Sequence, residues 1–167
     1  MNRSDRRYPE RPIVGVGGVI LVESGSPIDG LPSPAPKPFG VVLVRRRFEP
    51  LAGEWSLPGG ALEVGETLAA GVAREMLEET GLVVDVQGVV EVFDRILLDE
   101  IGDEPQRVRH HYVLIDYLCR PTGGRLEAGS DAADVRLVHP AALAEFHVTP
   151  LVEAVVAKAI RLVDAGS

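Results

Sequence analysis

The chain has 167 residues, of which 46% are apolar and 25% are charged, as in an ordinary globular protein. This length fits one domain and excludes a second full domain. The formal net charge of −8 argues against a protein that binds long nucleic acid or an acidic membrane through a basic face.

The N-terminal part of the chain predicts a tail and a hairpin. Residues 1–11 are polar and charged, so we expect a flexible tail. The apolar run 12–22 follows several arginines, but nearby acids and prolines and its own glycines favour a buried strand over a signal peptide. A Pro-rich insertion over 23–39 then leads to a valine-rich strand over 40–47. We expect the two strands to pair as a hairpin, and the insertion to be either a flap over a site or an inert excursion.

One helix is predicted in the middle of the chain. Residues 48–66 carry Pro and Gly turn residues, and the next segment fits a helix over 67–80. Thr67 can cap its start, and Gly81 can end it in the left-handed conformation. The spacing predicts a core-facing stripe of Leu68 or Ala69, Val72, Ala73, Met76, Leu77 and Thr80.

Strands dominate the next part of the chain. Residues 83–98 predict one or two strands, 99–106 an acidic turn region, and 108–120 another strand, followed by a loop over 121–134. The single cysteine, Cys119, excludes an internal disulfide and fits a buried small side chain better than a reactive thiol.

The end of the chain predicts a short strand over 135–138 and two helices that start at Pro140 and at Thr149-Pro150. Because strands and helices do not alternate regularly, this order favours an α/β fold with a mixed sheet, formed by one domain over 12–165. No stretch reaches the roughly 20 apolar residues of a membrane span. We therefore expect a cytoplasmic protein that does not bind membranes.

Half of the net charge lies in residues 60–82, which hold five glutamates and one arginine. Glu75, Glu78 and Glu79 are three and four residues apart, so their carboxylates share one helix surface and repel one another. Glu78 and Glu79 also lie in the last turn, where the helix dipole disfavours negative charge. The one base within a turn of them is Arg74.

A solvated helix face is the ordinary explanation of such a charge run, but solvated faces usually mix both signs. A bound divalent cation would supply the missing positive charge. Oxygen ligands without Cys or His suit Mg²⁺ or Mn²⁺ better than zinc, and Mg²⁺ commonly binds carboxylates together with substrate phosphates. The segment therefore predicts a site for a small phosphorylated ligand.

The same segment resembles the Nudix box, which runs Gly, five residues, Glu, seven residues, Arg-Glu, an apolar residue, any residue, Glu-Glu, any residue, Gly and an apolar residue. Every place is filled here, by Gly60, Glu66, Arg74, Glu75, Met76, Glu78, Glu79, Gly81 and Leu82. The preceding sequence WSLPGG also looks like the family's approach to the box. Over the rest of 12–160 the similarity is one of element order.

This resemblance implies a Nudix hydrolase, with an α/β/α sandwich around a central mixed sheet. It implies hydrolysis of the diphosphate of a nucleoside diphosphate linked to another moiety, by attack of water on phosphorus. The implied substrate is a small nucleotide. Many members are homodimers, so a homodimer is compatible with the resemblance.

The resemblance also implies Mg²⁺ or Mn²⁺ as cofactor. Glu75 and Glu79 would be the principal ligands, and Glu78 would be a further ligand or the general base. Arg74 would orient the glutamates, and the main-chain carbonyl of Gly60, or of the glycine before it, would complete the metal site. Support of the box is the implied role of Glu66 and Gly81.

Some members of this family take the general base from a loop beyond the box. The candidate loop acids are Glu127, Asp131 and Asp134, for which a solvated position is an equal alternative. Weaker candidates are Asp94, Asp99 and Glu100.

Substrate contacts are harder to assign. Arg46 and Arg47 end the second strand ahead of the box, where guanidinium groups could bind phosphate. Trp55 could stack on a base or pack in the core. The same two alternatives hold for Phe93 and Tyr112.

Residues downstream of the box do not separate the substrate classes of the family. ADP-ribose or a related nucleoside diphosphate sugar is the first expectation, because of the sequence GEWSLPGG and the overall length. A (d)NTP pyrophosphohydrolase of the housecleaning type is the alternative. The rivals from other classes are a non-catalytic nucleotide-sensing Nudix domain and an acidic protein-interaction domain.

Overall fold

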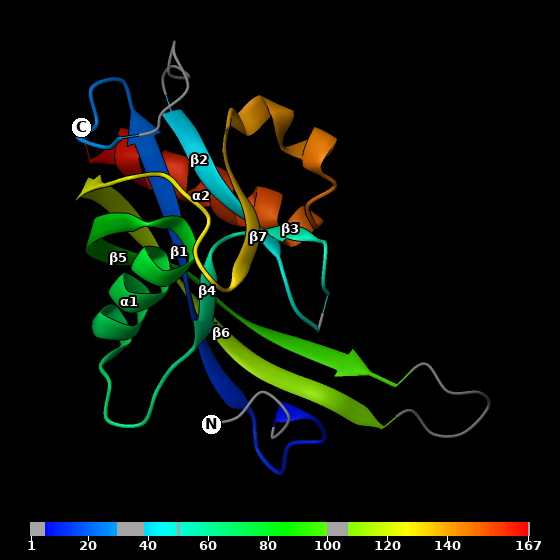
Figure 1. Cartoon of the computed structure of the whole chain (residues 1–167). Coiled ribbons are helices and arrows are strands. Elements are labelled where there is room, and N and C mark those ends of the chain that lie inside the picture. Colours follow the sequence, from blue (N-terminus) through cyan, green and yellow to red (C-terminus); the bar gives the residue numbers. More distant parts are fainter. Residues whose placement is uncertain (1–5, 30–38, 50, 100–106, 167) are drawn as a thin grey trace.

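The computed structural model in Figure 1 describes residues 6–29, 39–49, 51–99 and 107–166. Within these ranges the elements are β1 (Ile13–Glu23), β2 (Phe39–Arg46), β3 (Trp55–Ser56), β4 (Gly59–Ala61), α1 (Leu68–Thr80), β5 (Leu82–Leu98), β6 (Val108–Gly124), β7 (Ala132–Val138), the 3₁₀-helix η2 (Pro140–Phe146) and α2 (Pro150–Ala165).

The described strands form one mixed sheet. Its path is β3-β2-β1-β6-β5, and β4 pairs with β1 while β7 pairs with β2. β1 and β6 run parallel, starting with Ile13 opposite Tyr112, and the other pairs are antiparallel. β1 and β2 form the predicted hairpin, with Leu21 opposite Val41. The mixed sheet expected from the element order is confirmed.

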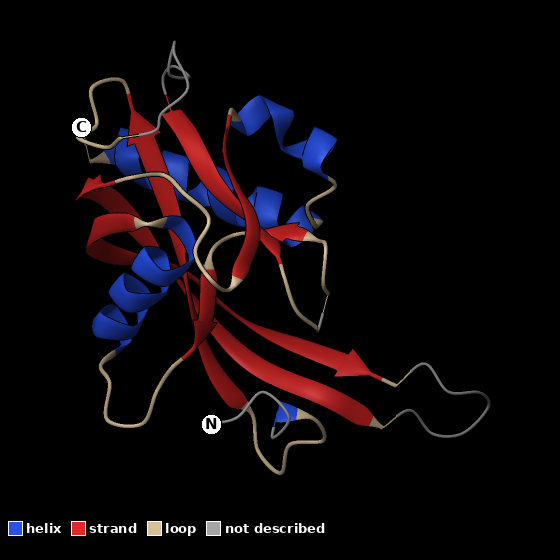
Figure 2. Ribbon diagram, in the orientation of Figure 1, coloured by secondary structure: helices blue, strands red, loops and turns tan. Residues whose placement is uncertain are grey.

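Two helices cover opposite faces of this sheet, as Figure 2 shows. Alternate residues of β1 point to different faces. Val16 and Ile20 pack in one core cluster with Val72 of α1. Val19 belongs to a second cluster, with Val155 of α2. The molecule is therefore the expected α/β/α sandwich, and β1 lies at its centre.

Helix α1 begins and ends where the sequence predicts. The Thr67 hydroxyl accepts a backbone hydrogen bond of 3.2 Å in the first turn, and Gly81 ends the helix at a left-handed φ of 72°. The predicted core stripe is wrong at one position, because Leu77 is 52% exposed whereas Glu75 is buried. At about 100° per residue, Leu77 lies on the far side of the helix from Val72. The buried face of α1 carries a glutamate in its place.

The strands after α1 are longer than predicted. β5 is one strand of 17 residues, β6 continues to Gly124 and β7 starts at Ala132. Cross-strand pairing with β5 overrides the turn signals at the end of β6, so the predicted loop 121–134 is shortened. Three backbone amides of this region donate hydrogen bonds to carbonyls at the C-terminal end of α1: Arg125 to Gly81, Glu127 to Thr80 and Gly129 to Glu79. These bonds hold the segment against the end of the helix.

Within the predicted N-terminal tail, residues 6–8 contact the ribbon formed by β5 and β6. The Tyr8 amide donates a 2.9 Å hydrogen bond to the carbonyl of Arg109, and its hydroxyl donates to Asp99 at 3.2 Å. The Arg107 guanidinium lies 4.0 Å from the ring centroid of Tyr8. These partners become available because β5 and β6 extend beyond the sandwich, which the polar composition of the segment did not reveal.

Parts of three predicted segments lie outside the described residues. These parts are residues 1–5 of the tail, 30–38 of the Pro-rich insertion and the turn region 100–106 with Glu100. Asp29, near the start of the insertion, forms a parallel bridge with Arg125. No helix in the described ranges is long and apolar enough to cross a membrane.

Candidate active site

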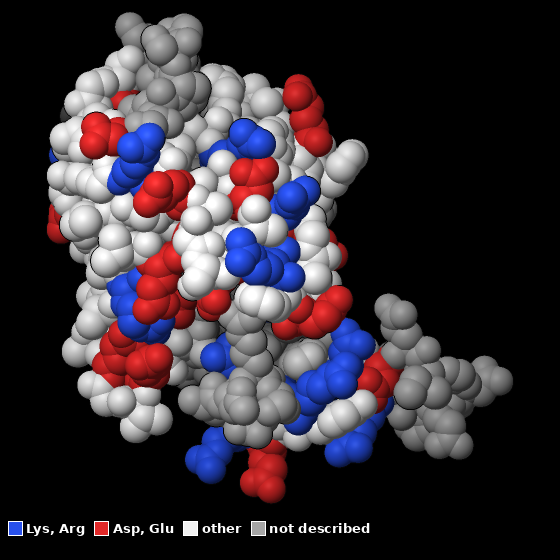
Figure 3. Space-filling view, in the orientation of Figure 1, with Lys and Arg blue, Asp and Glu red and all other residues white. Residues whose placement is uncertain are grey.

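An open pocket of about 890 Å³ lies beside β1, β4 and β6 and reaches both α1 and α2. Its acidic part contains Glu75 and Glu79 of α1 and Asp131 from the loop before β7. Its basic part is lined by Arg6, Arg7, Arg46, Arg47, Arg95 and Arg109. In Figure 3 acidic side chains gather over α1, and basic side chains gather along the projecting β5–β6 ribbon.

The acidic part of the pocket is built against the glycines of β4. Glu79 Oε2 accepts a 2.9 Å hydrogen bond from the amide of Gly59. A β-carbon at Gly60 would collide with the carboxylate of Glu75. The missing side chain therefore lets the helix carboxylates approach the strand backbone, and β4 is itself held by pairing with β1.

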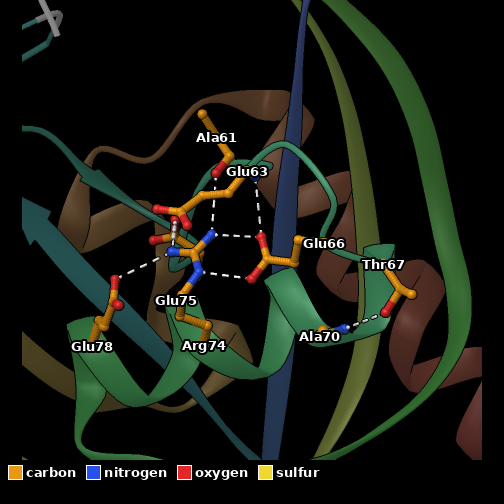
Figure 4. A network of polar contacts seen from close by, with 8 residues as sticks. All are labelled: Ala61, Glu63, Glu66, Thr67, Ala70, Arg74, Glu75 and Glu78. Carbon is orange, nitrogen blue, oxygen red and sulfur yellow. Dashed lines mark hydrogen bonds and ion pairs between the residues drawn. The ribbon is translucent and has the colours of Figure 1, made fainter. Parts of the chain in front are cut away.

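Arg74 connects the glutamates of the box, as Figure 4 shows. Its Nε and Nη2 donate to the two carboxylate oxygens of Glu66 at 2.8 and 3.0 Å. Its Nη1 donates to Glu75 at 2.7 Å and to Glu78 at 3.2 Å, and Nη2 reaches the carbonyl of Ala61 at 3.2 Å. The forked guanidinium thus fixes the loop before α1, β4 and three carboxylates at once.

Burial raises the pKa of both glutamates in the pocket. The pKa of Glu79 rises to about 7, chiefly because burial removes water from its charged form, and the Gly59 amide and the charge of Arg46 offset only part of this. Burial also raises the pKa of Glu75, although Arg74 opposes the change. The negative charge of Asp131 raises both pKa values further. A cation bound in this part of the pocket would offset the cost of these buried negative charges.

The ligand atoms available here fit a hard divalent cation. They are carboxylate oxygens of Glu75, Glu79 and Asp131 and main-chain carbonyls of β4, which suit Mg²⁺ or Mn²⁺. Glu78, the third predicted ligand of the helix, lies outside the lining, with its side chain 50% exposed and 3.2 Å from Arg74. Within the described ranges no three acidic or histidine side chains surround a common point as they stand. The Arg74 guanidinium holds the carboxylate of Glu75, and the Gly59 amide holds that of Glu79. These two carboxylates would therefore have to turn to form a complete ligand set.

The basic part of the pocket contains a guanidinium, that of Arg95, which makes no hydrogen bond or ion pair in the described part of the chain. Its pKa is lowered chiefly by burial and also by the charge of Arg46, and the charge of Glu54 opposes the change. The Nε atoms of Arg6 and Arg109 are buried and have no hydrogen-bond partner among the described residues. Buried donors of this kind are satisfied by an anionic ligand.

The predicted loop acids do not all reach the pocket. Asp131 lines it, whereas Glu127 is outside the lining, with its side chain 69% exposed and 4.0 Å from Arg125. Asp134 lies 3.0 Å from the guanidinium of Arg136. Two weaker candidates also lie outside the lining, namely Asp94 and Asp99.

The predicted substrate contacts are likewise divided. Arg46 and Arg47 line the pocket, and so do Phe93 and Tyr112. Trp55 is outside the lining, because its ring packs in the core at the edge of a neighbouring aromatic ring, with a centroid distance of 5.2 Å and an angle of 87°. Its core position agrees with the packing alternative.

Several charged residues of the pocket were missing from the predictions, among them Arg95, Arg109 and Asp116. Alternation along β6 places Asp116 on the same face as Tyr112 and Leu114, which also line the pocket. A lone acid in an apolar stretch of this strand was the available signal. Alternation does not show which face of a strand meets a pocket, so the signal was insufficient.

A family model described as the NUDIX domain matches residues 33–159. The chain belongs to the Nudix family. The match contains the whole of segment 60–82 with Arg74, Glu75, Glu78 and Glu79, as well as the loop that carries Asp131.

Relatives of this Nudix domain carry different substrate names. An ADP-ribose pyrophosphatase of Methanocaldococcus jannaschii is 36% identical over 95 residues, which cover 56% of this chain and 51% of the relative. A putative 8-oxo-dGTP diphosphatase 2 of Mycobacterium tuberculosis is 46% identical over 65 residues, or 38% of this chain and 40% of the relative. The aligned part thus spans about half or less of each relative.

A solved Nudix structure agrees with the fold over nearly the whole chain. The NUDIX domain of Shewanella oneidensis NrtR, crystallised with ADP ribose, superposes with a TM-score of 0.67 at 17% identity, covering 98% of this chain and 94% of that domain. This likeness shows a shared Nudix architecture.

Proposed function

We propose that this Nudix domain is a divalent-metal-dependent pyrophosphohydrolase that cleaves the diphosphate of a nucleoside diphosphate linked to another moiety. The observation that carries the proposal is the placement of two glutamates, the buried Glu75 and the partly buried Glu79, against glycine backbone in a pocket whose basic part is lined by arginines. Carboxylates and guanidinium groups in one pocket suit a metal-bound diphosphate.

Each residue of the acidic part has a role in this proposal. Glu75 and Glu79 are the principal metal ligands, Glu78 is a further ligand or the general base, and the carbonyl of Gly60 completes the site. When bound, Mg²⁺ or Mn²⁺ would polarise phosphoryl oxygens and lower the pKa of water. Arg74 orients the carboxylates through the contacts already described.

The remaining pocket residues bind and position the substrate. Arg46, Arg47 and Arg95 bind the phosphate oxygens, since guanidinium groups form two parallel hydrogen bonds to such groups. Asp131 is the loop acid that lies close enough to influence both pocket glutamates, which makes it the second candidate for the general base. Glu66 and Gly81 support the loop and the helix end.

ADP-ribose or a related nucleoside diphosphate sugar is the first candidate substrate. This choice is supported by the name of the relative from Methanocaldococcus jannaschii and by the ADP ribose bound in the Shewanella oneidensis domain. A (d)NTP is the second candidate, supported by the relative named as an 8-oxo-dGTP diphosphatase and by the number of arginines, which suits a third phosphate.

The test is hydrolysis of a panel of ADP-ribose, other nucleoside diphosphate sugars, (d)NTPs and dinucleoside polyphosphates, with Mg²⁺ or Mn²⁺, by chromatography of the products. We expect one class to be cleaved, and the cleavage to stop with chelator or in Glu79→Gln. Glu153→Gln, an exposed change on α2, is the matched control and should retain activity. Nucleotide binding without turnover would instead identify a sensing domain, and neither binding nor turnover would identify an interaction domain.

A further inference from the structure

Asp116 is a buried carboxyl group that the proposed reaction does not use. It lies in β6, it is only 7% exposed, and it lines the pocket. β1 carries a glycine directly opposite, Gly17, whose missing side chain leaves the space that the carboxylate occupies. Gly17 thus keeps this carboxylate open to the pocket.

No donor satisfies this carboxylate in the described part of the chain. None of the side-chain hydrogen bonds or ion pairs formed there involves Asp116, and burial raises its pKa to about 6, with a further contribution from the charge of Glu91. A buried carboxylate without a donor is costly. Such a group on a pocket wall is satisfied when a ligand brings an N–H donor.

The pocket wall beside Asp116 is apolar and aromatic, whereas its direct partner across the strands is Glu91, which is paired with Lys158. Phe93 of β5 pairs with Leu114, so Phe93 is the diagonal neighbour of Asp116 across the strands. Both side chains line the pocket together with Leu57 and Val152. Diagonal neighbours are about 7–8 Å apart, within reach of an aromatic ring. An apolar slot with one acceptor suits a nucleobase, whereas the negative charge repels phosphate.

The register of the sheet places this slot at a defined distance from the box. Gly59 of β4 pairs with Gly17 of β1, and Gly17 pairs with Asp116 of β6. With neighbouring strands about 4.7–4.9 Å apart, Asp116 lies about two strand spacings from Gly59, which binds Glu79. A ribose can bridge the gap between a diphosphate at Glu79 and a base at Asp116.

We propose that Asp116 accepts a hydrogen bond from the exocyclic amino group of a purine base, so that the pocket selects amino-bearing purines over hypoxanthine. Adenine offers this donor at N6, and guanine offers N2–H next to N1–H. Hypoxanthine has no exocyclic amino group. The inference rests on the proposed function, because it assumes that the substrate is a nucleotide whose diphosphate lies at Glu79.

The test is equilibrium binding of AMP, GMP and IMP to the full chain and to Asp116→Ala. We expect AMP or GMP to bind the unchanged chain about tenfold more tightly than IMP, or better, since a hydrogen bond to a charged group is of that strength. The ratio should fall close to one in Asp116→Ala, which removes the acceptor. Whichever of AMP and GMP binds more tightly identifies adenine or guanine as the preferred base. Asp85→Asn, an exposed change on β5, should keep the ratio.

Equal affinity of the unchanged chain for all three nucleotides, or an unchanged ratio in Asp116→Ala, would overturn the proposal. Asp116→Asn, which keeps an acceptor oxygen but loses the charge, serves as a second variant and should retain part of the ratio, and thermal unfolding of both checks that they fold. Metal-dependent turnover, measured in parallel, separates the two proposals. Turnover without base selectivity would support the proposed hydrolase function and contradict the role of Asp116. Base selectivity without turnover would support the role of Asp116 and contradict the hydrolase function.

Discussion

The carboxylate of Glu79 accepts a hydrogen bond of 2.9 Å from the backbone amide of Gly59, twenty residues earlier in the chain. This bond ties the end of α1 to the short strand β4. One neutral donor does not replace the water that burial removes, so the pKa of Glu79 rises to about 7. The hydrogen bond therefore holds the Glu79 carboxylate in place, while burial destabilises its charged form.

Glu79→Gln is expected to lose activity and keep its stability. Gln retains an acceptor for the Gly59 amide and removes the buried charge, whose cost above pH 7 is at most about 3 kcal/mol. Turnover should fall about 100-fold or more through the lost metal ligand. The metal-free melting temperature at pH 8 should stay equal or rise, by calorimetry. A clear drop in that temperature would contradict the charge argument.

Arg74→Lys is expected to destabilise the protein and lower its activity. An ammonium group cannot reproduce the fork that contacts both oxygens of Glu66 and also reaches Glu75. We expect a loss of about 1–3 kcal/mol in the free energy of unfolding, from urea titration. Arg161→Lys, at an exposed position of α2, is the control. Equal stability of the two variants would show that the fork is dispensable.

Arg95→Gln is expected to weaken substrate binding without weakening the fold. Arg95 makes no ion pair in the described ranges and its pKa is lowered by burial, so its charge costs stability in the absence of an anion. KM should rise about tenfold or more, since one hydrogen bond to a charged group is lost, and the melting temperature should not fall. Steady-state kinetics and calorimetry measure both, and an unchanged KM would remove Arg95 from the binding site.

Asp116 predicts a specific pH dependence of stability. Its pKa is about 6 in the folded chain against an ordinary value of 3.8, so the folded state binds the proton more tightly. Relative to Asp116→Asn, the unchanged chain should therefore lose stability as pH rises from about 4 to 6, by at most about 3 kcal/mol, and no further above. Urea unfolding of both chains between pH 4 and 8 gives the difference, and a flat difference would contradict the burial of this charge.

Cys119 should be inert until the chain unfolds. It is fully buried, and burial raises its pKa to about 12, so both access and thiolate are missing. A thiol reagent at pH 8 should react at the rate of global unfolding. Rapid reaction with the folded protein would show that β6 opens locally.

Local patterns determined much of the fold and part of the site. The caps Thr67 and Gly81 fixed α1 because capping depends on neighbouring residues only. The spacing of Glu75 and Glu79 likewise placed both on one helix face, since four residues are about one turn. The fold class and the family follow from this local information.

Contacts between distant segments decided the rest. The end of β6 depends on pairing with β5, and the anchoring of Tyr8 depends on the edge of that ribbon. Leu77 is exposed, against the prediction, and Glu75 is buried because the helix face that meets the sheet is set by packing. Asp116 and Arg95 became pocket residues only when strands remote in sequence met in the sheet. The sequence alone thus determined the helix with its acidic box, because hydrogen bonds and side-chain spacing within a few residues define it. Only the tertiary structure decided what surrounds that box, because the walls of a pocket are built from residues far apart in the chain.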